Sequence, residues 1–305
     1  MSAESRASPT RSASAGSPLS LASGAPTAMA ALSPPAPLRA AAALCSREII
    51  RFVRQRNRIV ASIGTPLVFW LLFGAGLSRS FKIGGDAASE QSFLQYFFPG
   101  SLLLLVLFTA IFSSISIIED RREGFLQGVL VAPIPRWAMV LGKNLGGTIV
   151  ALVQGLIFLL LALTLPIELS LVRGLQLVAL LAVASLALTS LGFAFAWRTD
   201  SSQGFHVIMN LVLMPLWLLS GGFFPAPELA AKATVSETML HYAMRLNPLS
   251  YAVGGVRRLL APEAVYPGCW VPELTTCWIV TALFAAIAFT AAVWISRERT
   301  AGDLL

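Results

Sequence analysis

Six long apolar segments alternate with shorter polar stretches along the chain. They cover, approximately, residues 59–77, 94–118, 144–165, 174–197, 205–224 and 274–295. Each segment has about 19–25 residues, and at a rise of about 1.5 Å per residue a helix of that length crosses the hydrocarbon core of a bilayer, which is about 30 Å thick. The pattern predicts an all-α polytopic membrane protein with six transmembrane helices.

A different pattern precedes the first apolar segment, over residues 39–58. Arg47, Arg51, Arg54 and Arg58 recur at steps of four, three and four, which places them on one face of a helix. Basic amphipathic helices of this kind are typical of segments that lie in the membrane interface. We therefore expect an N-terminal interface helix. A solvated charged face with no specific partner is the alternative.

The stretch between the fifth and sixth apolar segments, residues 225–273, has a mixed pattern. It contains two helix-like pieces, Pro227 to Met244 and Leu249 to Leu260, with prolines before, between and after them. The stretch is too apolar for a free loop and too broken for a membrane span. We expect short re-entrant or interfacial helices on the outer face of the membrane.

The two ends of the chain lie outside the apolar pattern. Residues 1–38 are rich in Ser, Ala and Pro, and we expect a disordered tail there, with a transit peptide as the alternative. A start at Met29 would shorten this tail. Residues 59–296 form the expected six-span domain, and residues 297–305 form a short C-terminal tail.

Composition and charge narrow the class of protein. Of the 305 residues, 56% are hydrophobic and 12% are charged, which excludes an ordinary soluble domain and a disordered chain. The net charge is +7, but beside long apolar segments Lys and Arg indicate membrane topology and not nucleic-acid binding. Most of the 22 basic residues fall on the side of both termini, so we expect a multi-pass protein of the inner or plasma membrane with both termini in the cytoplasm.

No Asp, Glu, Lys or Arg lies inside the six apolar segments as drawn above, and His206 lies at the cytoplasmic edge of the fifth. Proton- or sodium-coupled transporters usually place such residues at mid-membrane, and intramembrane enzymes need a reactive or metal-binding cluster. His206 and His241 fall on opposite sides of the predicted topology, and the chain has no phosphate-binding loop. The sequence predicts no catalytic residue, no metal site and no cofactor in this chain, so the energy for any transport would come from another polypeptide.

The polar stretch between the second and third segments, residues 119–143, reads EDRREGFLQGVLVAPIPRWAMVLGK. A charged cluster, residues 119–123, is followed by a short amphipathic pattern from Gly124 to Val131, which Pro133 and Pro135 would end. A stiff helix bounded by charges and prolines can transmit force from a docked cytoplasmic protein. A charged loop that only sets topology is the alternative.

Two motifs in the chain resemble those of a known family. REGFLQGVLVAPIPRWAMVLGK is similar to the cytoplasmic coupling segment of ABC-2-type transporter permeases, which include membrane subunits of antibiotic, nodulation-factor and polysaccharide exporters. LLSGGFFP at 218–225, followed by LNPLSYAVGGVRRLL at 246–260, is similar to the family hallmark between the fifth and sixth spans. The resemblance covers roughly residues 40–300 and does not specify a substrate.

The resemblance implies a six-span subunit that pairs with a second permease, as a homodimer or a mixed pair, and docks a cytoplasmic ATP-binding-cassette ATPase. ATP and Mg²⁺ would bind to that partner. It implies that the ATPase contact includes the interface helix and Glu119, Arg122, Glu123, Gly124, Phe125, Leu126, Leu130 and Pro133. It also implies an outer motif, in which Ser220, Gly221, Gly222 and Pro225 form a turn and Asn247 and Pro248 break a re-entrant pair. Gln127 and Gly128 depart from the acidic and bulky residues that are commoner in the family.

The expected function is that of an exporter subunit for a drug, lipid or polysaccharide, driven by ATP hydrolysis on the partner. A secondary transporter and a non-transport membrane assembly factor are the alternatives. A membrane enzyme is a further alternative, with the outer acids Glu228, Glu237, Glu263 and Glu273 as the candidate reactive groups.

Overall fold

The computed structural model describes residues 36–77, 93–165, 167, 169–229, 234–262 and 269–298. Most of the expected N-terminal tail, including Met29, lies outside these ranges, as do Glu263 and the last residues of the C-terminal tail. Within the described ranges the chain is helical between its loops, and an isolated β-bridge pairs Pro227 with Cys269. The expected all-α class is confirmed.

The helices follow one another in a simple order. They are α1 (Pro37–Arg54), α2 (Arg56–Leu77), α3 (Phe93–Arg122), α4 (Phe125–Val131), α5 (Arg136–Leu159) with a 3₁₀ turn η1 (Leu160–Thr164), α6 (Leu171–Trp197), α7 (Ser202–Leu218), α8 (Val235–Leu246), α9 (Pro248–Leu260) and α10 (Leu274–Ile295). The last of these has the same bounds as the sixth apolar segment.

Five of the described helices are long and apolar enough to cross a membrane, namely α2, α3, α5 with η1, α6 and α10. The predicted fifth span, 205–224, corresponds to α7, which has only 17 residues and ends at Leu218. It stops there because the backbone turns at Gly221, whose φ is +74°, and because side chains from α9 and its N-cap bind carbonyl groups at the end of α7. Of the six expected spans, five correspond to helices of membrane-spanning length and the fifth corresponds to a shorter helix, α7.

Two helices extend beyond the predicted apolar segments and carry charge with them. The second segment was drawn to residue 118, yet α3 continues to Arg122. The third was drawn from residue 144, yet α5 begins at Arg136. Three of the added charged side chains, Glu119 and Asp120 of α3 and Lys143 of α5, form ion pairs that stabilise these extensions. The segments as drawn contain no Asp, Glu, Lys or Arg, but the longer helices that correspond to them do: Asp120 lies in α3 and Lys143 in α5.

The interface helix also ends earlier than predicted. The backbone turns at Gln55, after α1 ends at Arg54, and α2 begins at Arg56. Arg58 therefore lies in the first turns of α2 and not on the same helix as the other three arginines. Its side chain nevertheless reaches the same group of acids.

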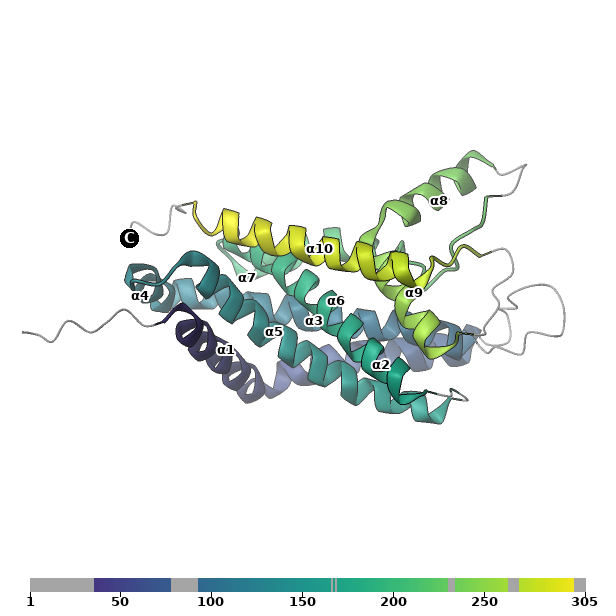
Figure 1. The fold of residues 1–305 in the computed structure, drawn as a ribbon, viewed down its shortest axis with the longest axis horizontal. Helices are drawn as coiled ribbons and strands as arrows, with labels where there is room; N and C mark the ends of the chain where they lie inside the picture. The colour runs from purple at the N-terminus through teal and green to yellow at the C-terminus, as the bar shows by residue number, and fades with distance from the viewer. Residues whose placement is uncertain are drawn as a thin grey trace, which may run out of the picture. The chain divides into compact units, whose positions relative to one another are not determined.

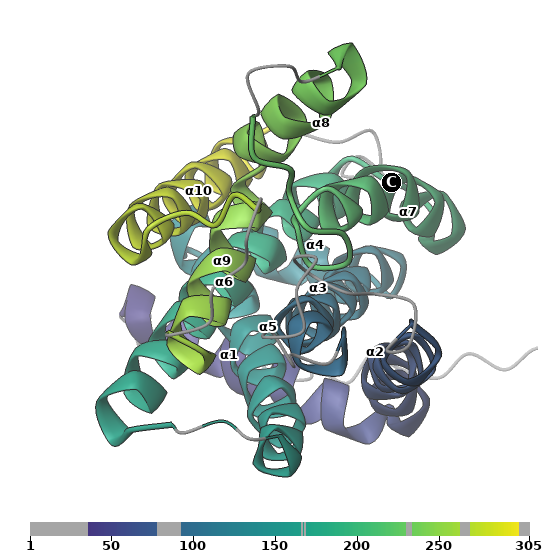
Figure 2. The ribbon, with the colours of Figure 1, turned by 90° about the vertical axis from the view of Figure 1, so that its right-hand side faces the viewer.

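α3 occupies the centre of the helix bundle. It packs against α2, α5 and α6, and Figure 2 shows these helices and α7 arranged around it. All residues from Leu102 to Leu107 are buried, as expected for a helix that is apolar on every side. α2 and α10 are more peripheral, and each exposes apolar side chains such as Leu72 and Ile279.

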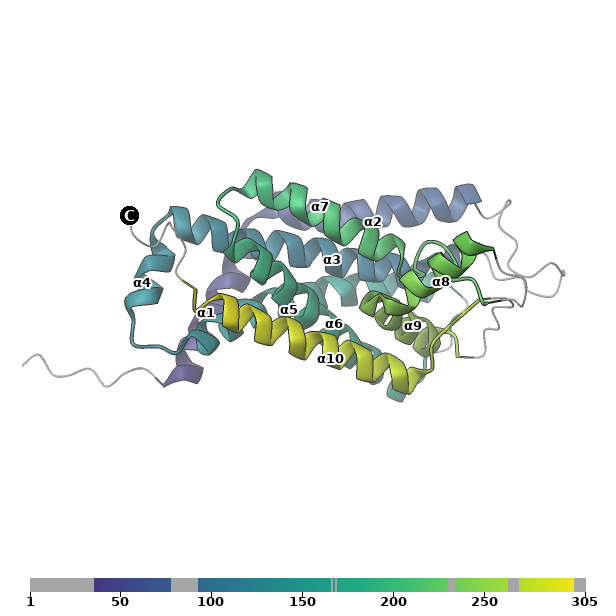
Figure 3. The ribbon, with the colours of Figure 1, turned by 90° about the horizontal axis from the view of Figure 1, so that it is seen from above.

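The short helices lie at opposite ends of this bundle. α1 and α4 lie at one end, together with the last turn of α10, and α8 and α9 lie at the other end (Figures 1 and 3). We refer to these as the α4 end and the α9 end. The two sequence motifs are thereby separated: the segment from residue 119 to 137 belongs to the α4 end, and the outer motif belongs to the α9 end.

Candidate functional site

The predicted short helix after the charged cluster is present as α4, Phe125–Val131. Its N-cap is Gly124, which has a φ of +76°, a backbone conformation that residues with a side chain rarely adopt. The chain then passes through Pro133 and Pro135 into α5. Glycine and proline thus fix a sharp reversal on each side of a helix of two turns.

The residues of α4 divide into an anchored side and a free side. Leu126 is buried in the hydrophobic core, and Phe125 lies beneath the guanidinium of Arg47, whose Cζ is 3.6 Å from the ring centroid. Val131 is 86% exposed, although it is apolar. Val131 is not among the residues for which an ATPase contact was expected. Of that set, Arg122, Glu123, Gly124 and Pro133 are exposed, whereas Glu119 and Leu130 are half-buried.

The arginine face of α1 is turned toward the end of α3. Arg47 donates two hydrogen bonds to Asp120, of 3.0 and 2.7 Å, in the paired geometry that suits a guanidinium and a carboxylate. Arg51 donates to Asp120, to Glu119 at 2.9 Å and to Glu123 at 3.3 Å. Arg58 pairs with Glu119. The alternative of a charged face without specific partners is therefore wrong for these three arginines, and Arg54 is the exposed member of the predicted set.

Three of the ionised side chains in this group are buried together. The ammonium of Lys143 lies between Glu48, at 2.7 Å, and Asp120, and the exposed fractions of Glu48, Asp120 and Lys143 are 4%, 0% and 4%. Burying a charge is costly unless it is paired and hydrogen-bonded. Each of the three has such a partner, so these side chains join α1, α3 and α5 at a single point.

We call the eight paired side chains the ion cluster. Its acids are Glu48, Glu119, Asp120 and Glu123, and its cations are Arg47, Arg51, Arg58 and Lys143. Burial alone would lower the pKa of the Arg47 guanidinium, but its hydrogen bonds to Asp120 and the charges of Asp120, Glu48 and Glu123 outweigh that effect and raise the pKa. Arg47 is thus held in its charged form.

Sequence reasoning missed the buried part of this cluster. Glu48 is the only acid in residues 39–58. It lies between Arg47 and Arg51 in the sequence, and its side chain is buried. Gly142 and Gly146 bring α1 close to α5, because a Cβ on either glycine would overlap Ala41 or Glu48. A lone acid on a basic helix, together with this pair of small residues, is the signal that could have indicated the contact.

The outer motif forms a compact turn at the α9 end. Ser220 is buried, and the carbonyl oxygen of Gly221 accepts hydrogen bonds of 2.9 Å from both the Tyr96 hydroxyl and the Arg257 guanidinium. The Arg257 guanidinium also lies 4.2 Å from the centroid of the Tyr96 ring. Gly222 packs directly on the backbone of Gly100 in α3, where a side chain would not fit. The motif therefore fixes the end of α7 against α3 and α9.

Asn247 and Pro248 separate α8 from α9, as expected. The Asn247 side chain caps α9 by accepting a hydrogen bond of 2.9 Å from the Leu249 backbone, and its amide donates one of 2.6 Å to the Leu216 carbonyl. Pro248 occupies the first turn of α9, where its missing N–H costs nothing. Pro225 is half-buried and follows the turn, close to the β-bridge between Pro227 and Cys269.

Comparison with known proteins agrees with the two motifs. A family model described as ABC-2 type transporter matches residues 39–260. The chain is 25% identical over 222 residues to the putative transport permease ycf38 of Cyanophora paradoxa, covering 71% of this chain and 72% of that protein. It is 28% identical over 177 residues to the inner membrane transport permease YhhJ of Escherichia coli K12, covering 57% and 44% of the two chains. It is 25% identical over 235 residues to nodulation protein J of Rhizobium leguminosarum bv. trifolii, covering 75% and 84%.

Proposed function

We propose that this chain, which belongs to the ABC-2 type transporter family, is the membrane subunit of an exporter that is driven by ATP hydrolysis on a separate ATP-binding-cassette subunit. ATP and Mg²⁺ would bind to that ATPase and not to this chain. The proposal also places both termini in the cytoplasm, with the α4 end facing the ATPase and the α9 end facing outward.

The observation that carries the proposal is the construction of α4. An apolar side chain that is 86% exposed, Val131, stands on a short helix whose other side is anchored through Leu126 and Phe125. Single exposed apolar residues are common on protein surfaces, but this one stands at the end of a short helix whose position is fixed, which suits a contact element. The helix is also too short to be stable by itself, so its anchoring favours a role as a rigid contact element over that of a loop which only sets topology.

The ion cluster offers a route from this contact to the membrane-spanning helices. Glu123 at the start of the α4 reversal pairs with Arg51 of α1, and Arg51 shares Asp120 with Lys143 of α5. A push on α4 would therefore act on α1, α3 and α5 together, since paired buried charges resist separation. In this proposal the ATPase moves the α4 end as a unit and so changes the access of the pathway between two permease subunits.

The secondary transporter gains no support from the buried charges. A coupling carboxylate must exchange its proton or ion during each cycle, whereas Asp120 and Glu48 are held by Arg47, Arg51 and Lys143. These groups also lie at the α4 end and not in the middle of the bundle. For the cargo of the exporter we propose only a chemical class, namely a drug, a lipid or a polysaccharide.

Pairing with a second permease subunit completes the proposal. α2 and α7 both carry exposed apolar side chains, among them Leu72 on α2 and Leu211 on α7. Lipid or a second copy would cover them. Native mass spectrometry of the purified full-length complex would give the number of permease and ATPase subunits, and a stable complex of one permease with no ATPase would contradict the proposal.

A site-specific crosslink tests the docking surface directly. A photo-reactive amino acid replaces Val131 in one variant and Val235 in α8 in a matched control, which is 78% exposed at the opposite end. Irradiation of cells followed by mass spectrometry should identify an ATP-binding-cassette ATPase joined to the Val131 variant alone. An ATPase joined equally to both variants, or to the Val235 variant alone, would overturn the assignment of the α4 end.

A further inference from the structure

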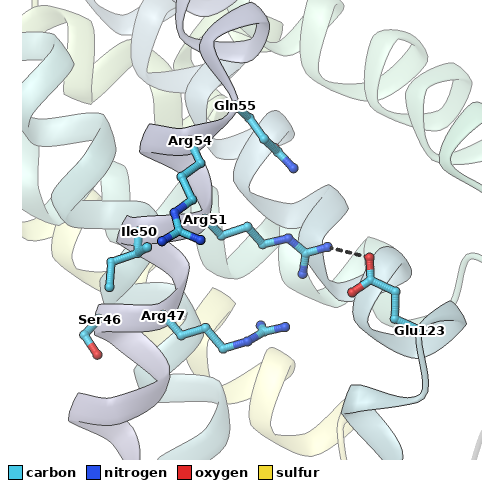
Figure 4. Close-up of a pocket in the computed structure, with 7 residues that line it drawn as sticks. All are labelled: Ser46, Arg47, Ile50, Arg51, Arg54, Gln55 and Glu123. Carbon is cyan, nitrogen blue, oxygen red and sulfur yellow. Dashed lines mark hydrogen bonds and ion pairs between the residues drawn. The ribbon is translucent and has the colours of Figure 1, made fainter.

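A pocket of about 540 Å³ opens beside the ion cluster, between α1 and the end of α3. Two adjacent rows of α1 side chains line it, with Glu123 on the facing wall, as Figure 4 shows. The lining residues are Ser46, Arg47, Ile50, Arg51, Arg54, Gln55 and Glu123. Its volume is in the range of cavities that hold small ligands.

The charges around this pocket do not balance. The ion cluster contains four acids and four cations, and each carboxylate is engaged by at least one of those cations. Arg54 also lines the pocket, but it forms no ion pair with any described acid. In Figure 4 a dashed line joins Arg51 to Glu123, and none reaches Arg54. The pocket therefore has a surplus positive charge.

The surroundings of Arg54 combine this charge with apolar surface. Ile50 lies on the same face of α1 as Arg54, about one turn before it, and Val53 lies three residues after Ile50. The two apolar side chains are 53% and 58% exposed. Gln55 alone separates α1 from α2, a helix of membrane-spanning length. Arg54 thus lies two residues before a candidate membrane span, and the proposed orientation of the chain places it near the lipid headgroups.

We propose that this pocket binds the phosphate of an anionic phospholipid, with Arg54 as the contacting cation and the acyl chains passing over Ile50 and Val53. A guanidinium suits phosphate because its planar N–H groups match two phosphate oxygens at once. Basic side chains close to the headgroups of anionic lipids are also attracted by the negative surface potential. An acidic segment of a protein partner, including the ATPase proposed to dock at this end, would match the charge of Arg54 but would leave the apolar side chain of Ile50 exposed beside the candidate span α2.

Lipid retention by the full-length protein tests this site. Protein reconstituted in vesicles of equal parts phosphatidylglycerol and phosphatidylcholine is extracted in detergent, and the phosphatidylglycerol that remains bound is measured by mass spectrometry. We expect Arg54→Ala to lower this retention about fivefold, and Arg54→Lys to keep most of it. Because Arg54 is exposed, both variants should elute from size exclusion like the wild type.

Arg39→Ala is the matched control, since Arg39 is an exposed cation on the same helix outside the pocket. An equal loss in this control, or unchanged retention in Arg54→Ala, would overturn the proposal in favour of diffuse surface attraction or none. Displacement of the lipid by millimolar inorganic phosphate would reassign the site to a soluble anion. Loss of a co-purifying protein from Arg54→Glu, with lipid retention unchanged, would reassign it to a protein partner.

Discussion

The two ends of the bundle bury polar groups in different ways. At the α4 end, charged side chains pair with charged side chains, and Lys143 lies between two acids. At the α9 end, Tyr96, Arg257 and Asn247 donate mainly to backbone carbonyl groups where α7 ends. One end is held by charge and the other by hydrogen bonds to a fixed turn.

This difference has a consequence for how each end tolerates change. Loss of one partner from a charged pair leaves an uncompensated buried charge, which costs far more than the pair itself contributes. Loss of a neutral hydrogen bond costs about 1 kcal/mol, plus the desolvation of the group left behind. The α4 end should therefore be more sensitive to charge, and the α9 end more sensitive to shape.

The largest effect should come from Lys143→Met. This change leaves Glu48 without its buried ammonium partner and weakens the compensation of Asp120, so we expect a loss of about 3–5 kcal/mol of stability. Thermal unfolding of the purified protein in detergent measures it. Combining Lys143→Met with Glu48→Gln should recover part of the loss, because Asp120 still pairs with Arg47 and Arg51.

The exposed pair Arg198–Glu298 is the control for that experiment. Its nitrogen and oxygen lie 2.9 Å apart, much as in the buried cluster, but both side chains are about half exposed. Arg198→Met should cost less than about 1 kcal/mol. Similar losses in Lys143→Met and Arg198→Met would show that burial of the ion cluster has no energetic consequence.

At the α9 end the expected sensitivity is to volume. Gly100→Ala would force a methyl group into the backbone of Gly222, and overpacking of this kind costs about 1–3 kcal/mol. Gly64→Ala in α2 is the matched control, because no atom lies within 4 Å of the position of the new Cβ. Thermal unfolding should separate the two variants, and equal stability would contradict the close packing of α3 on the outer motif.

The sequence predicted some parts of this arrangement well for a physical reason. The sixth span and the α4 helix are local features, set by hydropathy or by nearby glycine and proline, and the observed α10 and α4 match them. The Lys143–Glu48 contact joins residues 95 positions apart, so no local pattern contains it. A prediction from apolar residues alone also ends each helix at the first charged residue. It therefore missed the charged last turn of α3 and the charged first turns of α5, which the ion cluster stabilises.

Alanine in place of the two glycines of the α4 segment should have opposite effects on stability, because Gly124 has a positive φ and Gly128 lies inside the helix. Gly124→Ala would place a side chain at a φ of +76°, at a cost of about 1–2 kcal/mol, and should reduce ATP-coupled transport by moving α4. Gly128→Ala lies inside α4 with open space around its new Cβ and should stabilise the helix by about 1 kcal/mol. Transport assays with the purified complex measure the effect, and a normal rate in Gly124→Ala would argue against α4 as a rigid contact element.

The smallest effect should be a pH dependence at the α9 end, where a charge is exposed and not buried. Glu237 accepts hydrogen bonds from the backbone and the hydroxyl of Thr234, and these lower its pKa. Because the pKa is lower in the folded state, this cap stabilises α8 above the ordinary pKa of glutamate, and the stabilisation is lost as the pH falls through the lowered value. Hydrogen exchange in α8 should therefore be faster in Glu237→Gln than in the wild type at pH 7, and the two exchange rates should converge in acid.

Glu228→Gln is the control, since Glu228 is an exposed acid outside α8, and this variant should show no such difference. A difference between Glu237→Gln and the wild type that persisted at low pH would locate the effect in the shape of the side chain and not in its charge.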